Sequence, residues 1–144
     1  MKLSTKGRYG IHAMYDLALS GNDAPQPISR IAERQNIPEA YLEQLFGTLR
    51  RSGLVASVRG AAGGYLLSRP PGEITVGEVL RALEGELAFV DCLLEDDACD
   101  RSHTCPTRLV LGKVYAGVNR IVDGITLQDM IDDYQKPSAK EGIV

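Results

Sequence analysis

The chain has 144 residues, of which 44% are hydrophobic and 24% are charged. Its length suits one moderate domain, or a small domain with an appendage, and its composition allows a real hydrophobic core. No apolar run approaches the roughly 18 residues that span a bilayer. The N-terminal MKLSTKGRYG has no apolar stretch behind its charges, so we expect a cytoplasmic protein without a signal peptide and without a membrane partner.

The charge is unevenly distributed along the chain. Residues 1–69 carry nine Lys or Arg and five Asp or Glu, a net +4, whereas the remainder carries seven and fourteen, a net −7. A basic first half suits a polyanionic partner, and an acidic second half would be repelled by one. Charge blocks are also ordinary solvated faces, so this pattern alone does not establish DNA binding.

Three helices are predicted before residue 54. Residues 5–20 have apolar side chains at helical spacing, and either Ser4 or Thr5 can cap their first turn. A second helix is predicted at 27–34, and a third begins at Pro38 and stops at Gly53. The third helix has one buried stripe, formed by Leu42, Leu45, Phe46 and Leu49.

Two short strands follow the helices. Residues 54–58 and 65–68 favour strands, and the glycine-rich segment 59–64 joins them as a hairpin. Two helices separated by a tight turn and followed by a hairpin are the order of a winged helix-turn-helix. We therefore predict a mainly α fold with a small β-hairpin wing.

The second half is predicted to be helical around one long loop. A helix at 74–84 with Thr75 as its cap is followed by a loop at 86–105. The long helix at 106–123 has an apolar face (Leu109, Val110, Val114, Val118, Ile121 and Val122) too broad for a lone exposed helix, which predicts a homodimer through this helix. A last helix starts at Thr126. The predicted units are 1–72 for DNA binding, 73–136 for a cluster loop and dimerisation helices, and 137–144 as a disordered tail.

Residues on the third helix and the wing suit base and groove recognition. Gln44 can pair with adenine, and Glu43 can accept from cytosine N4 and act as a selector. Arg59 precedes a tip of small residues starting at Gly60, and an arginine there suits a narrow minor groove. A solvated polar helix face and a turn-forming glycine run are the alternatives. The predicted DNA-binding residues are Ser4, Lys6, Arg8, Tyr41, Glu43, Gln44, Arg51, Arg59 and Gly60.

The three cysteines of the chain are Cys92, Cys99 and Cys105. They have no C-x2-C spacing, so a zinc finger is not the first choice. Thiolates gathered in one loop favour zinc, copper(I) or an iron–sulfur cluster. A thiol redox switch and three unrelated thiols remain alternatives. His103 and His12 are the two histidines that could supply a fourth ligand.

The sequence resembles the iron–sulfur cluster regulator branch of the Rrf2 (Rrf-two) family of bacterial winged-helix transcription regulators. The resemblance covers nearly the whole chain and lies in LSTKGRYG at 3–10, AERQNIPEAYLEQLF at 32–46, LRRSGLVASVRGAAGGYLL at 49–67, ITVGEVLRALEG at 74–85, the cysteine loop and ITLQDM at 125–130. YLEQL and VRG-x-x-GGY are specific for the family. The cysteine triplet is specific for its cluster-binding members.

The resemblance implies a dimer crossed through the long helix, with a [2Fe–2S] or [4Fe–4S] cluster near the interface, of which we favour [2Fe–2S]. It implies that Glu43 and Gln44 enter the major groove and Arg59 the minor groove, in a repressor of cluster-assembly, iron, sulfur or stress genes. Some members place a histidine ligand three residues after the last cysteine, where this chain has Arg108. Others use a first-helix residue of the partner, where this chain has Arg8.

Two other functions are alternatives to a cluster-sensing regulator. The cysteine-metabolism branch of the same family is controlled by a protein partner or by thiol oxidation, but it lacks the cysteine triplet. An enzyme is not expected, because the sequence has no nucleophile–base pair and no phosphate loop with Walker spacing. Its GAAGG run lies at the tip of a predicted hairpin.

Overall fold

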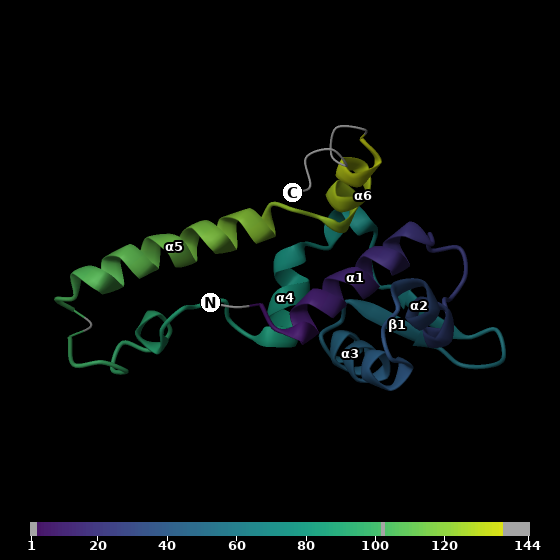
Figure 1. Cartoon of the computed structure of the whole chain (residues 1–144), viewed down its shortest axis with the longest axis horizontal. Helices are drawn as coiled ribbons and strands as arrows, with labels where there is room; N and C mark the ends of the chain where they lie inside the picture. Colours follow the sequence, from purple (N-terminus) through teal and green to yellow (C-terminus); the bar gives the residue numbers. More distant parts are fainter. Residues whose placement is uncertain (1–2, 102, 137–144) are drawn as a thin grey trace.

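The computed structural model describes residues 3–101 and 103–136, so the predicted disordered tail at 137–144 lies outside the described residues. Six α-helices, two strands and two single-turn 3₁₀-helices occur in this part of the chain (Figure 1). The predicted element order is confirmed. The elements are α1 Thr5–Leu19, α2 Ile28–Gln35, α3 Glu39–Arg51, β1 Val55–Val58, β2 Gly64–Leu67, η1 Pro71–Glu73, α4 Val76–Glu84, η2 Asp91–Leu93, α5 Pro106–Asp123 and α6 Leu127–Gln135.

The three N-terminal helices enclose the main core. Met14 and Leu17 of α1 and Phe46 of α3 are almost completely buried, and Ile31 of α2 packs with them. Asn36 makes the turn between α2 and α3 with a φ of 52°, a left-handed conformation that asparagine tolerates. The predicted buried stripe of α3 is confirmed, so its opposite face is exposed.

The wing is an antiparallel hairpin in which Val55 pairs with Leu67 and Val58 pairs with Gly64. The loop before α2 adds a bridge that the sequence did not predict. The N–H of Gln26 donates to the Tyr65 carbonyl, and the N–H of Tyr65 donates to the Gln26 carbonyl, both over 2.9 Å. The base of the wing is therefore joined directly to the start of the helix-turn-helix.

Helices α4 and α6 begin side by side. Thr75 and Thr126 each form a capping box with the acid three residues later, as predicted for the two caps. The extended residues before the helices pair, because Val76 N–H donates to the Ile125 carbonyl over 2.8 Å and Leu127 N–H donates to the Ile74 carbonyl over 3.0 Å. This pairing fixes α6 against the body that α1 and α4 form.

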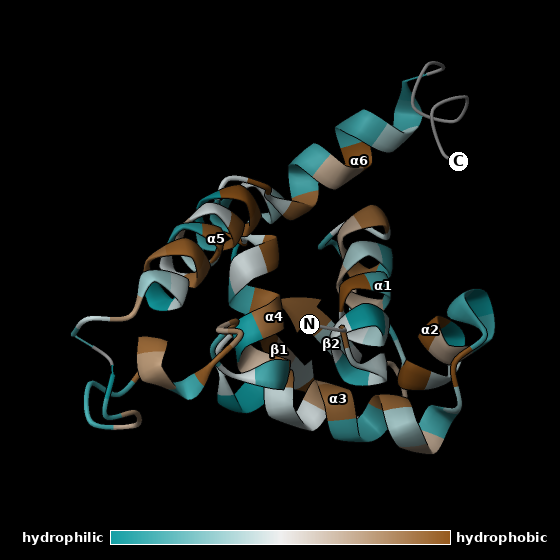
Figure 2. Ribbon diagram, turned by 60° about the vertical axis from the view of Figure 1, so that its left-hand side comes forward, coloured by the Kyte–Doolittle hydropathy of each residue, from teal (hydrophilic) through white to brown (hydrophobic). Residues whose placement is uncertain are grey.

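Helix α5 projects from that body, and its N-terminal end is far from α1–α3 (Figure 1). Hydrophobic residues occur along its length (Figure 2). Leu109, Val110 and Val114 are exposed by 71%, 61% and 42%. Val118 and Val122 instead pack against Val76 and Leu80 of α4, together with Leu87. The expectation that the whole apolar face awaits a partner is thus wrong for these two valines, because the C-terminal half of α5 covers α4. Of the described helices, none is both long and apolar enough to cross a membrane.

Candidate nucleic-acid interface and cysteine loop

The exposed face of α3 carries the predicted base-reading residues. Glu43, Gln44 and Arg51 are exposed, whereas Tyr41 is half-buried against Tyr9 of α1 in an edge-to-face contact with ring centroids 5.7 Å apart. Because its buried stripe fixes the rotation of α3, Glu43 and Gln44 face solvent on a helix that the core holds rigidly. This presentation suits entry into a major groove.

The wing tip is open to solvent. Arg59 and Gly60 are exposed, and Gly60 has a φ of 112° with no atom within 4 Å of where a Cβ would lie. A left-handed φ with nothing above it lets the backbone approach another backbone closely. The wing therefore presents an arginine and a bare backbone at one place, as a minor-groove contact requires.

The N-terminal segment adds basic residues beside α3. Lys6 and Arg8 are exposed, and the guanidinium of Arg8 lies over the Tyr9 ring. Lys6 lines a hollow of about 140 Å³ with Tyr41 and Gln44. Ser4 differs from the other predicted residues, because its N–H and hydroxyl both donate to the Glu84 carboxylate. Sequence reasoning missed Glu84, since nothing in the local pattern brings the end of α4 to the start of α1.

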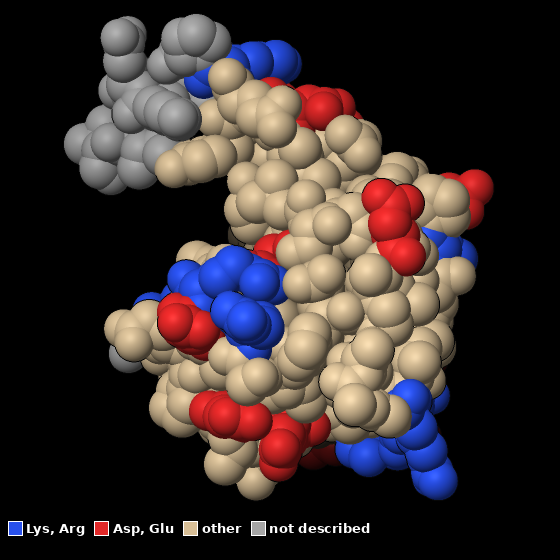
Figure 3. Space-filling model, turned by 90° about the vertical axis from the view of Figure 1, so that its right-hand side faces the viewer, with Lys and Arg blue, Asp and Glu red and all other residues tan. Residues whose placement is uncertain are grey.

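Charge on the surface is divided into patches. Lys and Arg side chains form separate groups on the face seen in Figure 3, and acidic side chains lie beside them. No continuous basic band crosses this face. On this face, basic side chains therefore stand in separate patches and do not form one broad electrostatic surface.

The cysteine loop lies between α4 and the N-terminal end of α5. Cys99 is exposed, whereas Cys92 and Cys105 are half-buried. Cys105 occupies the N-cap position of α5, and the nearby backbone N–H groups of Arg108 and Thr107 lower the pKa of its thiol, which favours thiolate. Among the described residues, no three His, Cys, Asp or Glu side chains stand close enough together to hold one metal ion. The loop as it stands therefore does not bring its three thiols to one point.

A cavity of about 690 Å³ lies between this loop and α5. Cys105, His103 and Arg108 line it together with apolar Leu93 and Leu109. His12 lines a different cavity, next to α6. Within one chain, His103 is thus the histidine that shares a cavity with a cysteine of the loop.

Arg108 connects the two ends of the cysteine loop. Its Nε donates to the Cys92 carbonyl over 3.0 Å, and its Nη2 pairs with Asp96 over 3.0 Å. Arg108 stands at the position where the resemblance leads one to expect a histidine ligand. A guanidinium does not ligate iron. It instead holds the backbone of Cys92 against the first turn of α5.

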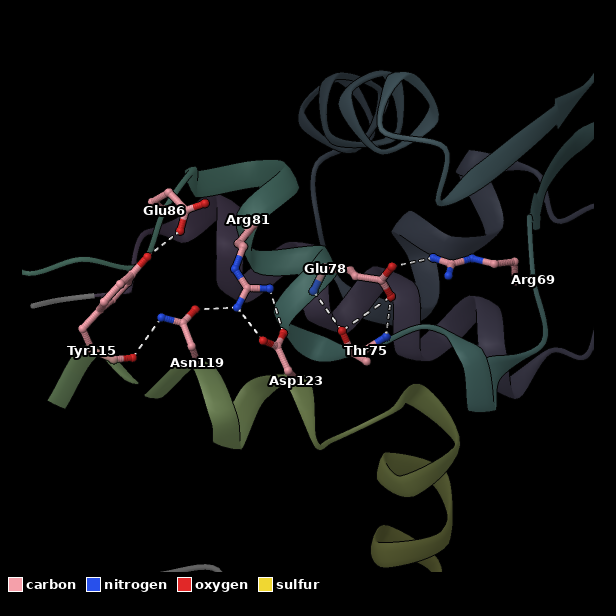
Figure 4. Close-up of polar contacts among 8 residues, drawn as sticks. All are labelled: Arg69, Thr75, Glu78, Arg81, Glu86, Tyr115, Asn119 and Asp123. Atoms are coloured by element: carbon pink, nitrogen blue, oxygen red, sulfur yellow. Dashed lines mark hydrogen bonds and ion pairs between the residues drawn. The ribbon is translucent and has the colours of Figure 1, made fainter. Parts of the chain in front are cut away.

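Helix α4 joins the wing to α5 through polar contacts (Figure 4). Arg69, just after β2, donates to Glu78 of α4 over 2.8 Å. Arg81, one turn further along α4, forms a bidentate pair with Asp123 of α5 over 2.7 and 2.8 Å. The Tyr115 hydroxyl of α5 donates to Glu86 at the start of the cysteine loop over 2.9 Å. The DNA-reading unit and the loop are thus connected through one helix.

A helix-turn-helix followed by a hairpin wing, with the predicted base-reading residues exposed on α3, is the architecture of a winged-helix DNA-binding transcription regulator. The chain belongs to the Rrf2 family, described as "Iron-dependent Transcriptional regulator", which matches residues 3–133. Both the predicted fold and the predicted family are confirmed.

Relatives and solved structures agree with this assignment. The "HTH-type transcriptional regulator IscR" of Aliivibrio salmonicida is 41% identical over 92% of this chain and 79% of that protein. Its counterpart from Cronobacter sakazakii is 39% identical over 94% and 83%. The structure titled "T. potens IscR" covers all of this chain and 93% of its own, with 42% identity and a TM-score of 0.77. CymR, the "Global Cysteine Regulator of B. subtilis", is 38% identical, with coverages of 94% and 99% and a TM-score of 0.78.

Proposed function

We propose that the chain is a cytoplasmic, homodimeric repressor whose DNA binding depends on an iron–sulfur cluster held by Cys92, Cys99 and Cys105. The single observation that carries this proposal is the placement of all three cysteines in the loop directly before the exposed half of α5. That half is also the surface left for a second subunit. Cluster and dimer contact would then share one region.

The donor set fits such a cluster by its chemistry. Three thiols, one of them with a pKa lowered by the N-terminal N–H groups of α5, are the soft ligands that iron–sulfur clusters take. When bound, the cluster would supply a redox- and oxygen-sensitive centre. The loop must close to bring the thiols together, and Arg108, which holds Cys92 near α5, limits how far it has to move.

The fourth ligand is proposed separately. His103 is the favoured protein candidate because it lines the same cavity as Cys105. His12 would require a second subunit to bring it to the loop. A small-molecule thiol or solvent is the remaining option, and a [2Fe–2S] form is favoured over [4Fe–4S].

Protein purified without oxygen tests the cluster directly. We expect visible absorption with iron and sulfide in equal amounts, and loss of both in Cys92→Ala, Cys99→Ala or Cys105→Ala. His103→Ala should shift the spectrum if His103 ligates, and His12→Ala tests the second histidine in the same way. Purification with zinc alone, or full clusters in the single cysteine variants, would contradict the proposal.

A second candidate is a cysteine-responsive repressor, favoured by the likeness to the B. subtilis cysteine regulator. Such a protein would bind DNA without iron and respond to an enzyme partner or to thiol oxidation. DNA affinity measured with and without the cluster separates the two. Equal affinity in both forms, together with a loss on mild oxidation of the cluster-free protein, would favour the second candidate.

A further inference from the structure

Glu84, the last residue of α4, contacts the residue that caps α1. The Ser4 N–H donates to Glu84 Oε1 over 2.8 Å, and the Ser4 hydroxyl donates to the same oxygen. The hydroxyl also accepts from the N–H of Gly7 as the helix cap. A carboxylate of the same chain therefore takes both Ser4 donors that could reach a DNA phosphate.

This carboxylate lies inside the candidate DNA interface. Glu84 and Ser4 line a hollow of about 510 Å³ with Lys6 and Tyr41. The adjoining smaller hollow shares Lys6 and Tyr41 and extends to Gln44 on α3. A negative charge here repels phosphate, and it is held where the dipole of α1 favours an anion. Glu84 thus competes with DNA for the same donors.

The same segment begins the cysteine loop. Gly85 ends α4 with a φ of 78°, and the carboxylate of the next residue, Glu86, accepts from the Tyr115 hydroxyl of α5. Glu84 and Glu86, on either side of Gly85, therefore contact the start of α1 and the middle of α5, respectively. Gly85 alone separates Glu84 from Glu86 along the chain, so a displacement at the start of the loop would act two residues from Glu84.

We propose that Glu84 is an autoinhibitory residue: it withholds Ser4 from DNA phosphate, and a shift at the start of the cysteine loop releases it. The competition with DNA stands on the contacts of Ser4 and Glu84 alone. The release step rests on the proposed function, since it requires a loop with cluster-bound and cluster-free states.

Affinity measurements test the competition. The probe is a labelled duplex selected from a random library by the wild-type protein, titrated at one salt concentration. Glu84→Ala should bind about three- to tenfold more tightly, since one repelling charge and one competitor are removed. Exposed Glu73 of η1 is the charge control, and Glu73→Ala should leave the affinity near wild type.

A double-mutant cycle separates competition from bulk charge. In a Ser4→Ala background, the gain from Glu84→Ala should fall to roughly half or less, because the hydroxyl that Glu84 withholds is gone. An equal gain in both backgrounds, or no gain in wild type, overturns the proposal.

Gly7→Ala should release Ser4 from Glu84 while leaving the negative charge of Glu84 in the protein. A Cβ at position 7 would lie 2.8 Å from Glu84 Oε1, so the flexible carboxylate has to move away from Ser4. Helical content by circular dichroism would establish that the variant folds. It should then bind DNA more tightly than wild type, and an unchanged affinity in a folded variant overturns the release of Ser4.

The link to the loop is tested with cluster-loaded and cluster-free protein. In Glu84→Ala the ratio of the two DNA affinities should move toward one. If the wild type shows a ratio that Glu84→Ala leaves unchanged, the link fails and the proposed function stands. If the wild type takes up no cluster, the proposed function and the release step fail, and the double-mutant cycle still decides the competition.

Discussion

The guanidinium of Arg34 forms a bidentate ion pair with the buried carboxylate of Asp16. Arg34 Nη2 lies 2.7 Å from Oδ1 and Nε lies 3.0 Å from Oδ2, and Gln35 adds an amide hydrogen bond of 2.8 Å to Oδ2. The pair joins α2 to α1, and the hydrogen bond to Asp16 raises the pKa of Arg34. The ion pair therefore fixes α2, the helix that precedes α3 with its predicted base-reading residues.

This pair predicts an asymmetry between its two partners. The Asp16 side chain is 5% exposed and that of Arg34 is 41% exposed. Arg34→Ala leaves a buried carboxylate with one amide partner and should cost about 2–3 kcal/mol of unfolding free energy. Asp16→Asn keeps an acceptor and leaves a cation that water can reach, so its cost should be about 1 kcal/mol. Urea unfolding of both variants checks this order, and equal losses would contradict it.

Gly64 permits the close approach of the wing to the loop before α2. Its φ is 151°, and a Cβ there would lie 2.2 Å from the Gln26 carbonyl oxygen, a backbone atom that cannot turn aside. Gly64→Ala should lower the free energy of unfolding by about 1–3 kcal/mol, the usual cost of a strained backbone. Gly72→Ala is the control, because its nearest atom would be 3.9 Å away. A Gly64→Ala variant as stable as the control would contradict the close approach of Gly64 to the Gln26 backbone.

The exposed half of α5 gives a sharper test of the dimer than its whole apolar face. Val110→Glu with Val114→Glu should give monomers of unchanged helical content, because both side chains are exposed. Lys113→Glu adds the same charge on an exposed position of the same helix and should stay dimeric. Val118 is left unchanged in these variants because it packs against α4 of its own chain. Sedimentation measures the outcome, and an intact dimer in the double variant would refute the interface.

The pair between Arg81 and Asp123 predicts a pH dependence. The hydrogen bond from Arg81 lowers the pKa of Asp123. A carboxyl with a lowered folded-state pKa stabilises the fold above its unfolded value of about 3.9 and loses that contribution as pH falls through the folded value. Asp123→Asn should therefore unfold more easily than wild type at pH 6, and the difference should shrink at pH 3. A difference that stays constant between the two pH values would argue against the pair.

Local patterns predicted the elements because each depends on residues close in sequence. Thr75, Thr126 and Gly53 act at caps and stops that three or four residues define, and the stripe of α3 sets its own rotation. The strand boundaries moved by one residue at three of their four ends, because β1 begins at Val55 and β2 runs from Gly64, which pairs with Val58, to Leu67.

Contacts between distant residues could not be predicted in this way. Glu84 reaches Ser4 across 80 positions, and Val118 is covered by α4 although its spacing matches that of exposed Val114. The cysteine loop is a further case. Its donors are recognisable from the sequence, but their distances depend on a loop that lacks helical or strand periodicity over most of its length.

Arg59 and Glu43 should affect DNA binding in different ways. Arg59 lies exposed on the wing, so Arg59→Ala should weaken binding by about 1–3 kcal/mol without changing thermal stability. Arg120→Ala removes an exposed arginine of α5 and is the control for charge alone. Glu43→Ala should retain affinity but relax the preference among operator variants, because it would remove the predicted acceptor for cytosine N4, which selects against other bases. Titration against a panel of single-base variants measures both effects. Unchanged selectivity would mean that Glu43 is a solvated surface acid, and an equal loss in Arg120→Ala would remove the minor-groove role of Arg59.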